Sequence, residues 1–423
     1  MKTVGVLTLG CKVNTYESEY VISKLKENNY IIKDFTEICD VYIINTCTVT
    51  NTADIKSKKM IKAAIKRNPN ACVVAMGCFI EANKDYEIEG LDIVIGNKDK
   101  SKIIELLDEY FIKKETLQRL YKEEKTVFED MYINDFPGRT RAFVKIQDGC
   151  ENFCSYCIIP FVRGKCRSKD KDQVIKEITD LVNNGYQEIV LTGIHTGNYG
   201  VDLDTNFANL LKELVKINGL KRLRISSIEI TELTKEVLEV IKESNIIVDH
   251  MHIPLQAGSD EILKLMNRKY DLNFFYNKIN EIRIIRPEIS ITTDVLVGFP
   301  GETEEMFKRT IQTCRELELT KMHVFPFSLR QGTKAGALPN HIETEVKKER
   351  ARRLLAVSKE LELSYYNKYL NKEVEVLIEE TKEGYSYGHT GNYLYVKINK
   401  ELEHNTFVKV TIKDIEYPYC IAE

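Results

Sequence analysis

The chain has 423 residues, 43% hydrophobic and 30% charged, which excludes wholesale disorder and a fibrous fold. Its 61 lysines and arginines nearly balance 64 aspartates and glutamates, so a basic protein that coats nucleic acid is not expected. No run of about 18 apolar residues is present, so we expect no contact with a membrane. The 11 cysteines form no secreted disulfide framework, since their number is odd and no usable signal peptide is seen. We therefore expect a cytoplasmic protein whose clustered cysteines bind metal or do chemistry.

The first part of the chain alternates short buried strands with helices, a pattern typical of a parallel sheet covered by helices. Strands are predicted at residues 3–9, 41–45, 72–76 and 92–95, and helices at 16–27, 53–66 and 98–110. We assign residues 1–112 to an N-terminal α/β domain. The charged stretch that follows ends in a Pro-Gly turn, so residues 113–138 are predicted to be a linker.

The alternation resumes in residues 139–366, where six strands in series predict a partial (β/α)6 barrel. The expected strands are 142–147, 188–192, 222–226, 248–253, 291–297 and 322–326, with helices including 172–183, 207–215, 235–242 and 302–316. A long charged helix is expected at 343–367. Four short strands with polar turns then predict a small all-β barrel in residues 367–423. The fold class is therefore α/β with a C-terminal all-β module.

Three cysteines share one loop after the first strand of the barrel, with the spacing C-x3-C-x2-C. They are Cys150, Cys154 and Cys157. Loops at the carboxyl ends of barrel strands carry active sites, and three thiolates can hold three irons of a [4Fe–4S] cluster, which leaves the fourth iron open. The alternative is a zinc site completed by Cys166.

A second set of cysteines comprises Cys11, Cys47 and Cys78, each of which directly follows a predicted strand. Loops that follow parallel strands emerge at one edge of a sheet, so these three thiols are expected to converge. A glycine before two of them allows the backbone to approach a bulky inorganic group. We infer a second [4Fe–4S] cluster. The alternative is that these are ordinary buried core thiols.

The sequence resembles the radical S-adenosylmethionine (SAM) methylthiotransferases along nearly its whole length. The N-terminal matches are TLGCKVN (8–14), INTCTVT (44–50) and MGC (76–78). The cysteine loop and the following IIPFVRG (158–164), LTGIH (191–195), ISSIE (225–229), HIPLQAGS (252–259) and DVLVGFPGET (294–303) match the radical SAM part. The last block resembles the TRAM domain of that family. It has more acidic than basic residues and no arginine, which is weakly electrostatic for an RNA-binding module.

The resemblance implies a tRNA-modifying enzyme that uses two [4Fe–4S] clusters and SAM to place a methylthio group on C2 of adenine 37. GCKVN at the first cysteine is similar to the branch that acts on N6-threonylcarbamoyladenosine (t6A). The expected partners are tRNA with t6A at position 37 and an electron donor such as flavodoxin or ferredoxin. An unactivated aromatic C–H bond offers no acidic proton, so chemistry supplied by a cofactor is the plausible route.

Candidates for binding SAM lie in the loops of the barrel: Tyr156, Gly193, Glu229 and Gln256. Glu229 and Gln256 are alternatively polar residues that line the barrel mouth without touching SAM. Candidates for contacting RNA are Lys58, Lys59, Lys62, Arg163, Lys165, Arg167, Arg350 and Arg353, which crowd two helices and the stretch after the cysteine loop. Solvated charged faces are the alternative for each group.

Two rival substrates remain within the family that the sequence resembles. They are isopentenyladenosine in tRNA and an aspartate of a ribosomal protein. A non-catalytic iron–sulfur or zinc protein that binds RNA is the alternative from a different class. Cleavage of SAM under reducing conditions separates that class from the enzymes.

Overall fold

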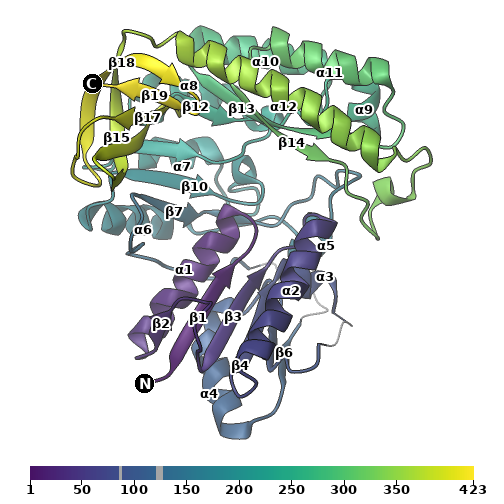
Figure 1. Cartoon of the computed structure of the whole chain (residues 1–423), viewed down its shortest axis with the longest axis vertical. Coiled ribbons are helices and arrows are strands. Elements are labelled where there is room, and N and C mark those ends of the chain that lie inside the picture. Colours follow the sequence, from purple (N-terminus) through teal and green to yellow (C-terminus); the bar gives the residue numbers. More distant parts are fainter. Residues whose placement is uncertain (85–87, 121–126) are drawn as a thin grey trace.

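The computed structural model describes residues 1–84, 88–120 and 127–423. Figure 1 shows an N-terminal α/β domain below, a second α/β domain above it, and a small β-barrel at one side of the second domain. Three hydrophobic cores are present. One runs from the N-terminal sheet into the second domain, another lies under the opposite face of the N-terminal sheet, and the third fills the β-barrel.

The N-terminal domain is a six-stranded parallel sheet with the order β2-β1-β3-β4-β5-β6. Its strands are β1 (Thr3–Thr8), β2 (Ile31–Lys33), β3 (Val41–Thr46), β4 (Cys72–Gly77), β5 (Ile93–Ile95) and β6 (Leu117–Arg119). Its helices are α1 (Lys12–Glu27), α2 (Asn51–Arg67), α3 (Cys78–Ala82) and α4 (Ile103–Lys113), with a 3-10 turn at Lys100–Lys102. The predicted strands are confirmed, whereas the short β2 and α3 were not predicted.

Strand β3 shows why this sheet is covered on both faces. Val41 and Ile43 pack into the core that contains α1 and α4, while Tyr42 and Ile44 pack into the core that contains α2. All six residues of β3 are buried. Strands buried on both faces are continuous apolar runs, which is the pattern that the sequence shows here.

The predicted linker 113–138 differs from the structure. Its first part adds β6 to the N-terminal sheet beside β5, so the domain extends past residue 112. Met131, Ile133 and Phe136 are buried in the main core, which makes this stretch a packed connection between the domains. The apolar residues are spaced among charged ones, so the sequence pattern resembles an exposed linker. Residues 121–126 of the predicted linker lie outside the described residues.

The second domain contains six parallel strands in two sheets of three, with the orders β11-β10-β7 and β12-β13-β14. They are β7 (Arg141–Lys145), β10 (Glu188–Thr192), β11 (Arg222–Ile225), β12 (His250–His252), β13 (Ser290–Val297) and β14 (Lys321–Pro326), and a small hairpin pairs β8 (Gln147–Asp148) with β9 (Arg167–Ser168). Isolated bridges from Leu223 to Ile247 and from Ser227 to His252 join the two sheets. The predicted partial (β/α)6 barrel is confirmed.

Helices cover the outside of this partial barrel. They are α6 (Lys171–Asn183), α7 (Phe207–Leu214), α8 (Lys235–Glu243), α9 (Asp260–Leu265), α10 (Leu272–Ile285), α11 (Glu304–Glu316) and α12 (Thr344–Asn367). The short helix α5 (Ile159–Arg163) instead packs against α3 of the N-terminal domain. Short 3-10 turns occur at Thr196–Asn198, Ile230–Glu232 and Lys334–Ala337. Helix α12 runs beside β14 and leads into the C-terminal module (Figure 1).

The C-terminal module is a closed barrel with the strand order β15-β16-β17-β19-β18. Its strands are β15 (Glu373–Lys382), β16 (Tyr385–Thr390), β17 (Tyr395–Ile398), β18 (Phe407–Glu416) and β19 (Tyr419–Ala422). Four of the five were predicted, and β19 was missed because it is short and follows a Tyr-Pro turn. No described helix of the chain has the length and apolar character needed to cross a membrane.

Candidate functional site

The three N-terminal cysteines converge because they follow three neighbouring strands. Cys11 is the N-cap of α1 after β1, Cys47 follows β3, and Cys78 begins α3 after β4. These strands are adjacent in the sheet, in the order β1-β3-β4. Gly10 has a φ of 103°, and a Cβ added there would lie 3.1 Å from the Cys47 Sγ, so glycine favours this close approach of the first two cysteines. Burial raises the pKa of the Cys47 thiol, and the nearby Cys78 and Cys11 raise it further, so the three thiols lie near one another. That they bind iron stays a prediction.

The loop cysteines lie in a turn that the rest of the barrel holds in place. The backbone N–H of Cys157 donates to the Cys154 carbonyl at 2.9 Å, and the N–H of Cys150 donates to the Gly164 carbonyl at 3.0 Å. Burial raises the pKa of the Cys157 thiol to about 12. A thiol must lose its proton to bind metal, so iron binding here releases protons.

The Cys154 thiol receives a charged donor from another part of the chain. The Arg268 guanidinium places Nη1 3.2 Å from the Cys154 Sγ, and its Nη2 pairs with Glu229. Burial raises the pKa of Cys154, and the Arg268 charge opposes that effect. A thiolate bound to iron keeps partial negative charge, which such a donor stabilises. Arg268 was missed in the sequence, since it lies more than a hundred residues after the loop in an ordinary charged stretch.

In the described part of the chain, no three His, Cys, Asp or Glu side chains gather closely enough to hold one metal ion. Ligands of a four-iron cluster bind different irons and therefore stand farther apart than ligands of one zinc. Cys166, the fourth ligand of the zinc alternative, lies with its Sγ 3.8 Å from the Gly149 carbonyl oxygen, and both Cys166 and Cys150 interact with His195.

Helix α5 separates the two sets of cysteines and contacts both. It starts directly after Cys157, and its last residue is Arg163. The Arg163 Nη2 donates to the Asn14 Oδ1 at 2.8 Å, in the helix that Cys11 caps. On the same side, Asn97 lies 3.6 Å from the Cys78 Sγ and donates to the Val162 carbonyl at 2.8 Å. The two predicted cluster sites thus flank one short helix.

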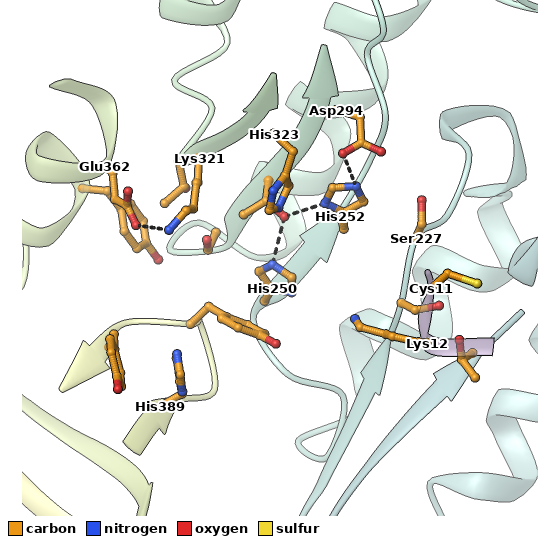
Figure 2. A pocket seen from close by; sticks show the side chains of 18 of the residues that line it. Cys11, Lys12, Ser227, His250, His252, Asp294, Lys321, His323, Glu362 and His389 are labelled. Atoms are coloured by element: carbon orange, nitrogen blue, oxygen red, sulfur yellow. Dashed lines mark hydrogen bonds and ion pairs between the residues drawn. The ribbon is translucent and has the colours of Figure 1, made fainter. Parts of the chain in front are cut away.

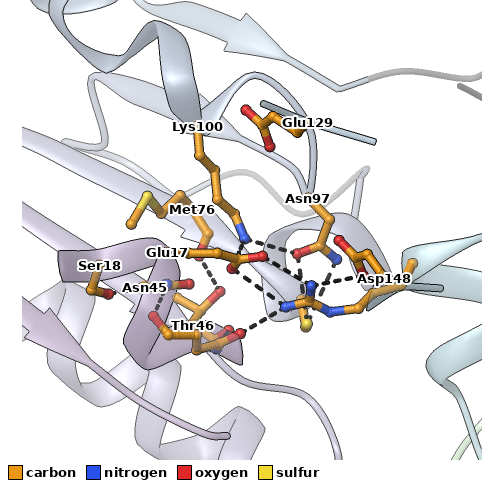
Figure 3. Close-up of polar contacts among 12 residues, drawn as sticks. Glu17, Ser18, Asn45, Thr46, Met76, Asn97, Lys100, Glu129 and Asp148 are labelled. Atoms are coloured by element: carbon orange, nitrogen blue, oxygen red, sulfur yellow. Dashed lines mark hydrogen bonds and ion pairs between the residues drawn. The ribbon is translucent and has the colours of Figure 1, made fainter. Parts of the chain in front are cut away.

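A buried network of charges fixes this arrangement (Figure 3). Glu17 of α1 accepts from Lys100, from Lys145 at 2.8 Å and from the Arg163 Nη1 at 3.0 Å. Burial favours the neutral acid, but the charges of Arg163, Lys100 and Lys145 outweigh it and hold the Glu17 pKa far below its ordinary value. Asp148 completes the network through Arg163 at 3.0 Å and Arg167 at 2.9 Å.

The Arg163 guanidinium is also strongly influenced by its neighbours. Burial favours loss of its charge, but the pKa of its guanidinium is raised well above the ordinary value by Cys78, then by Glu17, Asp148 and Cys11. Both Cys78 and Cys11 are thus near enough to interact with the Arg163 charge. No sequence signal marks Glu17 or Asn14 as partners, because helical periodicity does not show which polar residue faces another domain.

The predicted SAM residues fall into two groups. Tyr156 and Glu229 lie beside Arg268 at the cysteine loop, since the charges of both side chains act on its guanidinium. Gly193 and Gln256 lie elsewhere on the barrel. A Cβ at Gly193 would lie 3.1 Å from the Gln147 side chain. Gln256 has a φ of 66° and bridges to Val295 of β13. Their contact with SAM stays a prediction.

Three of the predicted RNA contacts are wrong, because their guanidinium groups are buried and paired. Arg163 and Arg167 bind Asp148, and Arg350 binds Glu302 at 2.6 Å. A cation buried inside an ion pair offers no free donor to a phosphate. The prediction rested on the density of basic residues near the cysteine loop, but the arginines there form ion pairs in the protein interior.

The other RNA candidates remain at the surface. Lys59, Lys62 and Lys165 are exposed, while Lys58 is half-buried over the Phe79 ring. Arg353 is half-buried and pairs with Glu304 at 2.8 Å. Lys59 and Lys62 lie on α2, the helix that follows Cys47. These two lysines are therefore the best placed of the candidates to meet phosphate.

A cavity of about 640 Å³ opens where the three domains meet. Cys11 and Lys12 line one side of it, strand residues such as Gly193, His250 and Asp294 line the barrel side, and His389 and Tyr393 come from the β-barrel. Figure 2 shows Cys11 and Lys12 across the cavity from His323 and Lys321. Cys11 is the only one of the six candidate ligands on this wall. The cavity therefore reaches the N-terminal cluster site directly.

Electrostatics around His250 show that this cavity is rich in positive charge. Burial lowers the pKa of His250 well below its ordinary value, and nearby Arg224, His252 and Lys12 lower it further. His250 and the His252 Nδ1 both lie 3.0 Å from the Thr292 hydroxyl, and His252 pairs with Asp294 at 3.2 Å. His250 is therefore neutral at pH 7.

Comparison with protein families divides the chain in the same way as the fold. Residues 144–314 match the radical SAM superfamily, and residues 3–96 match Uncharacterized protein family UPF0004. Among solved structures, the radical SAM methyltransferase TsrM from Kitasatospora setae is similar with a TM-score of 0.59 at 13% identity, over 79% of this chain and 75% of that one. This likeness shows the fold.

Relatives of assigned function match over the full length. The threonylcarbamoyladenosine tRNA methylthiotransferase MtaB of Bacillus subtilis is 44% identical over 99% of this chain and 95% of the relative. MtaB of Aquifex aeolicus is 37% identical over 97% of this chain and 100% of the relative. A tRNA-2-methylthio-N6-dimethylallyladenosine synthase of Clostridium botulinum is 35% identical over 90% and 88%. The chain therefore belongs to the radical SAM methylthiotransferase family, in the branch of the threonylcarbamoyladenosine tRNA methylthiotransferases.

Proposed function

We propose that this protein adds a methylthio group to C2 of t6A at position 37 of tRNA. The observation that carries this proposal is the full-length identity to proteins that bear the name of that activity. The structure supports it, because the two sets of three cysteines flank α5 and one of them reaches the central cavity.

Two [4Fe–4S] clusters and SAM are the cofactors of this proposal. Cys11, Cys47 and Cys78 would hold one cluster, and Cys150, Cys154 and Cys157 the other, each with one iron left open. When bound, the loop cluster supplies the electron that cleaves SAM to a radical able to attack an unactivated carbon. Supporting this assignment, both sets have polar neighbours suited to thiolates, namely Arg268 at Cys154 and Arg163 near Cys78.

The protein's own residues position the reactants. Arg268 fixes Cys154 and Glu229 together, which places Glu229 and Tyr156 beside the loop for contact with SAM. Arg163 and Glu17 lock the N-terminal domain against the barrel, so the distance between the two cluster sites is set before substrate binds. Holding reactants in a fixed geometry lowers the entropic part of the barrier.

The partners follow from the same proposal. The tRNA would approach along Lys59 and Lys62 of α2, and adenine 37 would leave its stacked loop to enter the cavity. A one-electron carrier such as flavodoxin or ferredoxin would reduce the loop cluster in the cytoplasm.

Mass spectrometry of tRNA nucleosides from a strain that lacks the gene tests the substrate. We expect 2-methylthio-t6A to disappear and t6A to accumulate, and the wild-type gene to restore the product. Loss of the methylthio-isopentenyl nucleoside instead would assign the other tRNA branch, and unchanged nucleosides with a loss of methylthio-aspartate would assign the ribosomal protein. Absence of SAM cleavage by the reduced, iron-loaded protein would point to a non-catalytic RNA-binding protein.

A further inference from the structure

The cavity between the domains contains a lysine without an acidic partner. Lys12 and Lys321 both line the wall. The Lys321 ammonium lies 2.9 Å from Glu362, whereas no carboxylate of the described residues is within ion-pair distance of Lys12. Lys12 directly follows Cys11, the candidate ligand on the same wall. The cavity therefore presents an uncompensated positive charge next to the N-terminal cluster site.

Two deeply buried polar atoms on the opposite wall also lack partners among the described residues. The His250 Nδ1 and the Ser290 hydroxyl make no hydrogen bond, although these residues are only 8% and 0% exposed. Both line the cavity. Buried polar groups are normally paired, so unpartnered ones in residues that line a cavity indicate a polar ligand. The Lys12 charge acts on His250, which shows that the charge and these polar groups share one space.

Two arginines lie behind this wall, and both are paired with Glu188, Arg224 at 2.9 Å and Arg141 at 3.0 Å. The Arg224 guanidinium stacks 4.2 Å from the Tyr393 ring, which lines the cavity, and its Nη2 has no hydrogen-bond partner. Arg141 lies 5.4 Å from the same ring. Of the two acidic residues on the lining, Glu362 is paired with Lys321 and Asp294 with His252. With both lining acids paired, the Lys12 charge makes an anion the ligand that the wall favours.

The threonylcarbamoyl group offers the charged and hydrogen-bonding partners that Lys12, His250 and Ser290 lack. It carries a carboxylate, a hydroxyl and a urea N–H, whereas a dimethylallyl group has no polar atom and would leave His250 and Ser290 unsatisfied. A volume of about 640 Å³ is of the size that holds small ligands. The adenine belongs at the Cys11 and Gly193 end, where the chemistry takes place. Its N6 substituent then extends toward the barrel strands.

We propose that this cavity is the site that reads the threonylcarbamoyl group, with the Lys12 ammonium binding its carboxylate and with His250 and Ser290 hydrogen-bonding its remaining polar atoms. The inference rests on the proposed function and makes Lys12 a specificity residue for it. A charge-assisted hydrogen bond of this kind is strong enough to set the apparent affinity for the substrate.

Removing the charge from the lysine or from the carboxylate tests the site. We would prepare Lys12→Met and Lys12→Arg as iron-loaded holoenzymes and assay them on an anticodon stem-loop RNA that carries t6A, and on the same RNA with the t6A carboxylate converted to its methyl ester. For wild type, we expect KM to be at least about tenfold lower on the acid than on the ester. Lys12→Met should lose that difference, and Lys12→Arg should keep most of it.

Controls separate this inference from the proposed function. Lys26→Met, at an exposed position in the last turn of the same helix, should keep the wild-type ratio of KM values. Iron content and SAM cleavage without RNA should match wild type in Lys12→Met, which shows that the neighbouring cluster is intact. If wild type modifies the t6A RNA but Lys12→Met shifts both substrates equally or neither, this inference fails alone. If wild type leaves the t6A RNA unmodified, the proposed function itself fails.

Discussion

Arg163 and Glu17 form a buried ion pair across the boundary between the N-terminal domain and the barrel, with Nη1 3.0 Å from Oε1. Neither side chain is exposed. Arg163 ends the helix that follows the loop cysteines, and Glu17 lies in the helix that Cys11 caps. Satisfied buried pairs add little net stability compared with apolar residues, but loss of one partner is costly. We interpret this pair as a device that fixes the relative position of the two cluster sites.

Replacing Arg163 by methionine should destabilise the protein strongly. The change removes one of the two cations that Glu17 and Asp148 share and leaves Lys145 as the other, and we expect a loss of about 3 kcal/mol in the free energy of unfolding. Urea denaturation of the iron-free protein, followed by circular dichroism, measures it without a contribution from metal. Lys165→Met, at an exposed position two residues later, is the matched control. An equal, small effect of both changes would show that the pair is dispensable.

The same network should make the protein sensitive to acid. The Glu17 pKa is lowered in the folded state, so its ionised form contributes stability above the ordinary pKa near 4.5, and this contribution is lost as pH falls toward the lowered value. Urea midpoints at pH 7, 5, 4 and 3 should therefore fall steeply for wild type. Glu17→Gln should start lower at pH 7 and fall less between pH 5 and 3. Glu27→Gln, on the exposed end of the same helix, should follow wild type; a parallel acid slope in Glu17→Gln would argue against this source of acid sensitivity.

The sequence predicted local features better than contacts between domains. The strand before each N-terminal cysteine could be predicted, since β3 and β4 are continuous apolar runs. Parallel topology then implied that Cys11, Cys47 and Cys78 lie at one edge of the sheet. The same analysis placed Arg163 and Arg350 on the surface, because a stretch of basic residues does not show which of them is buried in an ion pair. Such pairing depends on residues more than a hundred positions away, as with Glu17 and Arg163.

Iron analysis of two triple variants should separate the cluster sites. Wild type, reconstituted without oxygen, should hold about eight irons per chain, and each triple alanine variant should hold about four. Loss of Cys150, Cys154 and Cys157 should abolish formation of 5′-deoxyadenosine from SAM. Loss of Cys11, Cys47 and Cys78 should preserve it while product formation stops. SAM cleavage that survives in the first variant, or a wild type with about four irons, would contradict the assignment of two clusters.

The exposed lysines of α2 should contribute to tRNA affinity through phosphate contacts. Each contact to a duplex phosphate releases condensed counterions and adds about 0.9 to the slope of log affinity against log salt, or about 0.7 for a single strand. We therefore expect Lys59→Ala combined with Lys62→Ala to weaken binding of the anticodon stem-loop and to reduce this slope by about 1.5. Lys235→Ala, at an exposed position on α8, should leave the slope unchanged. Filter binding between 50 and 200 mM salt, roughly the range over which phosphate contacts dominate, measures both. An unchanged slope in the double variant would show that the RNA does not bind along α2. The path would then have to use exposed lysines elsewhere, because Arg163, Arg167 and Arg350 are paired with buried carboxylates.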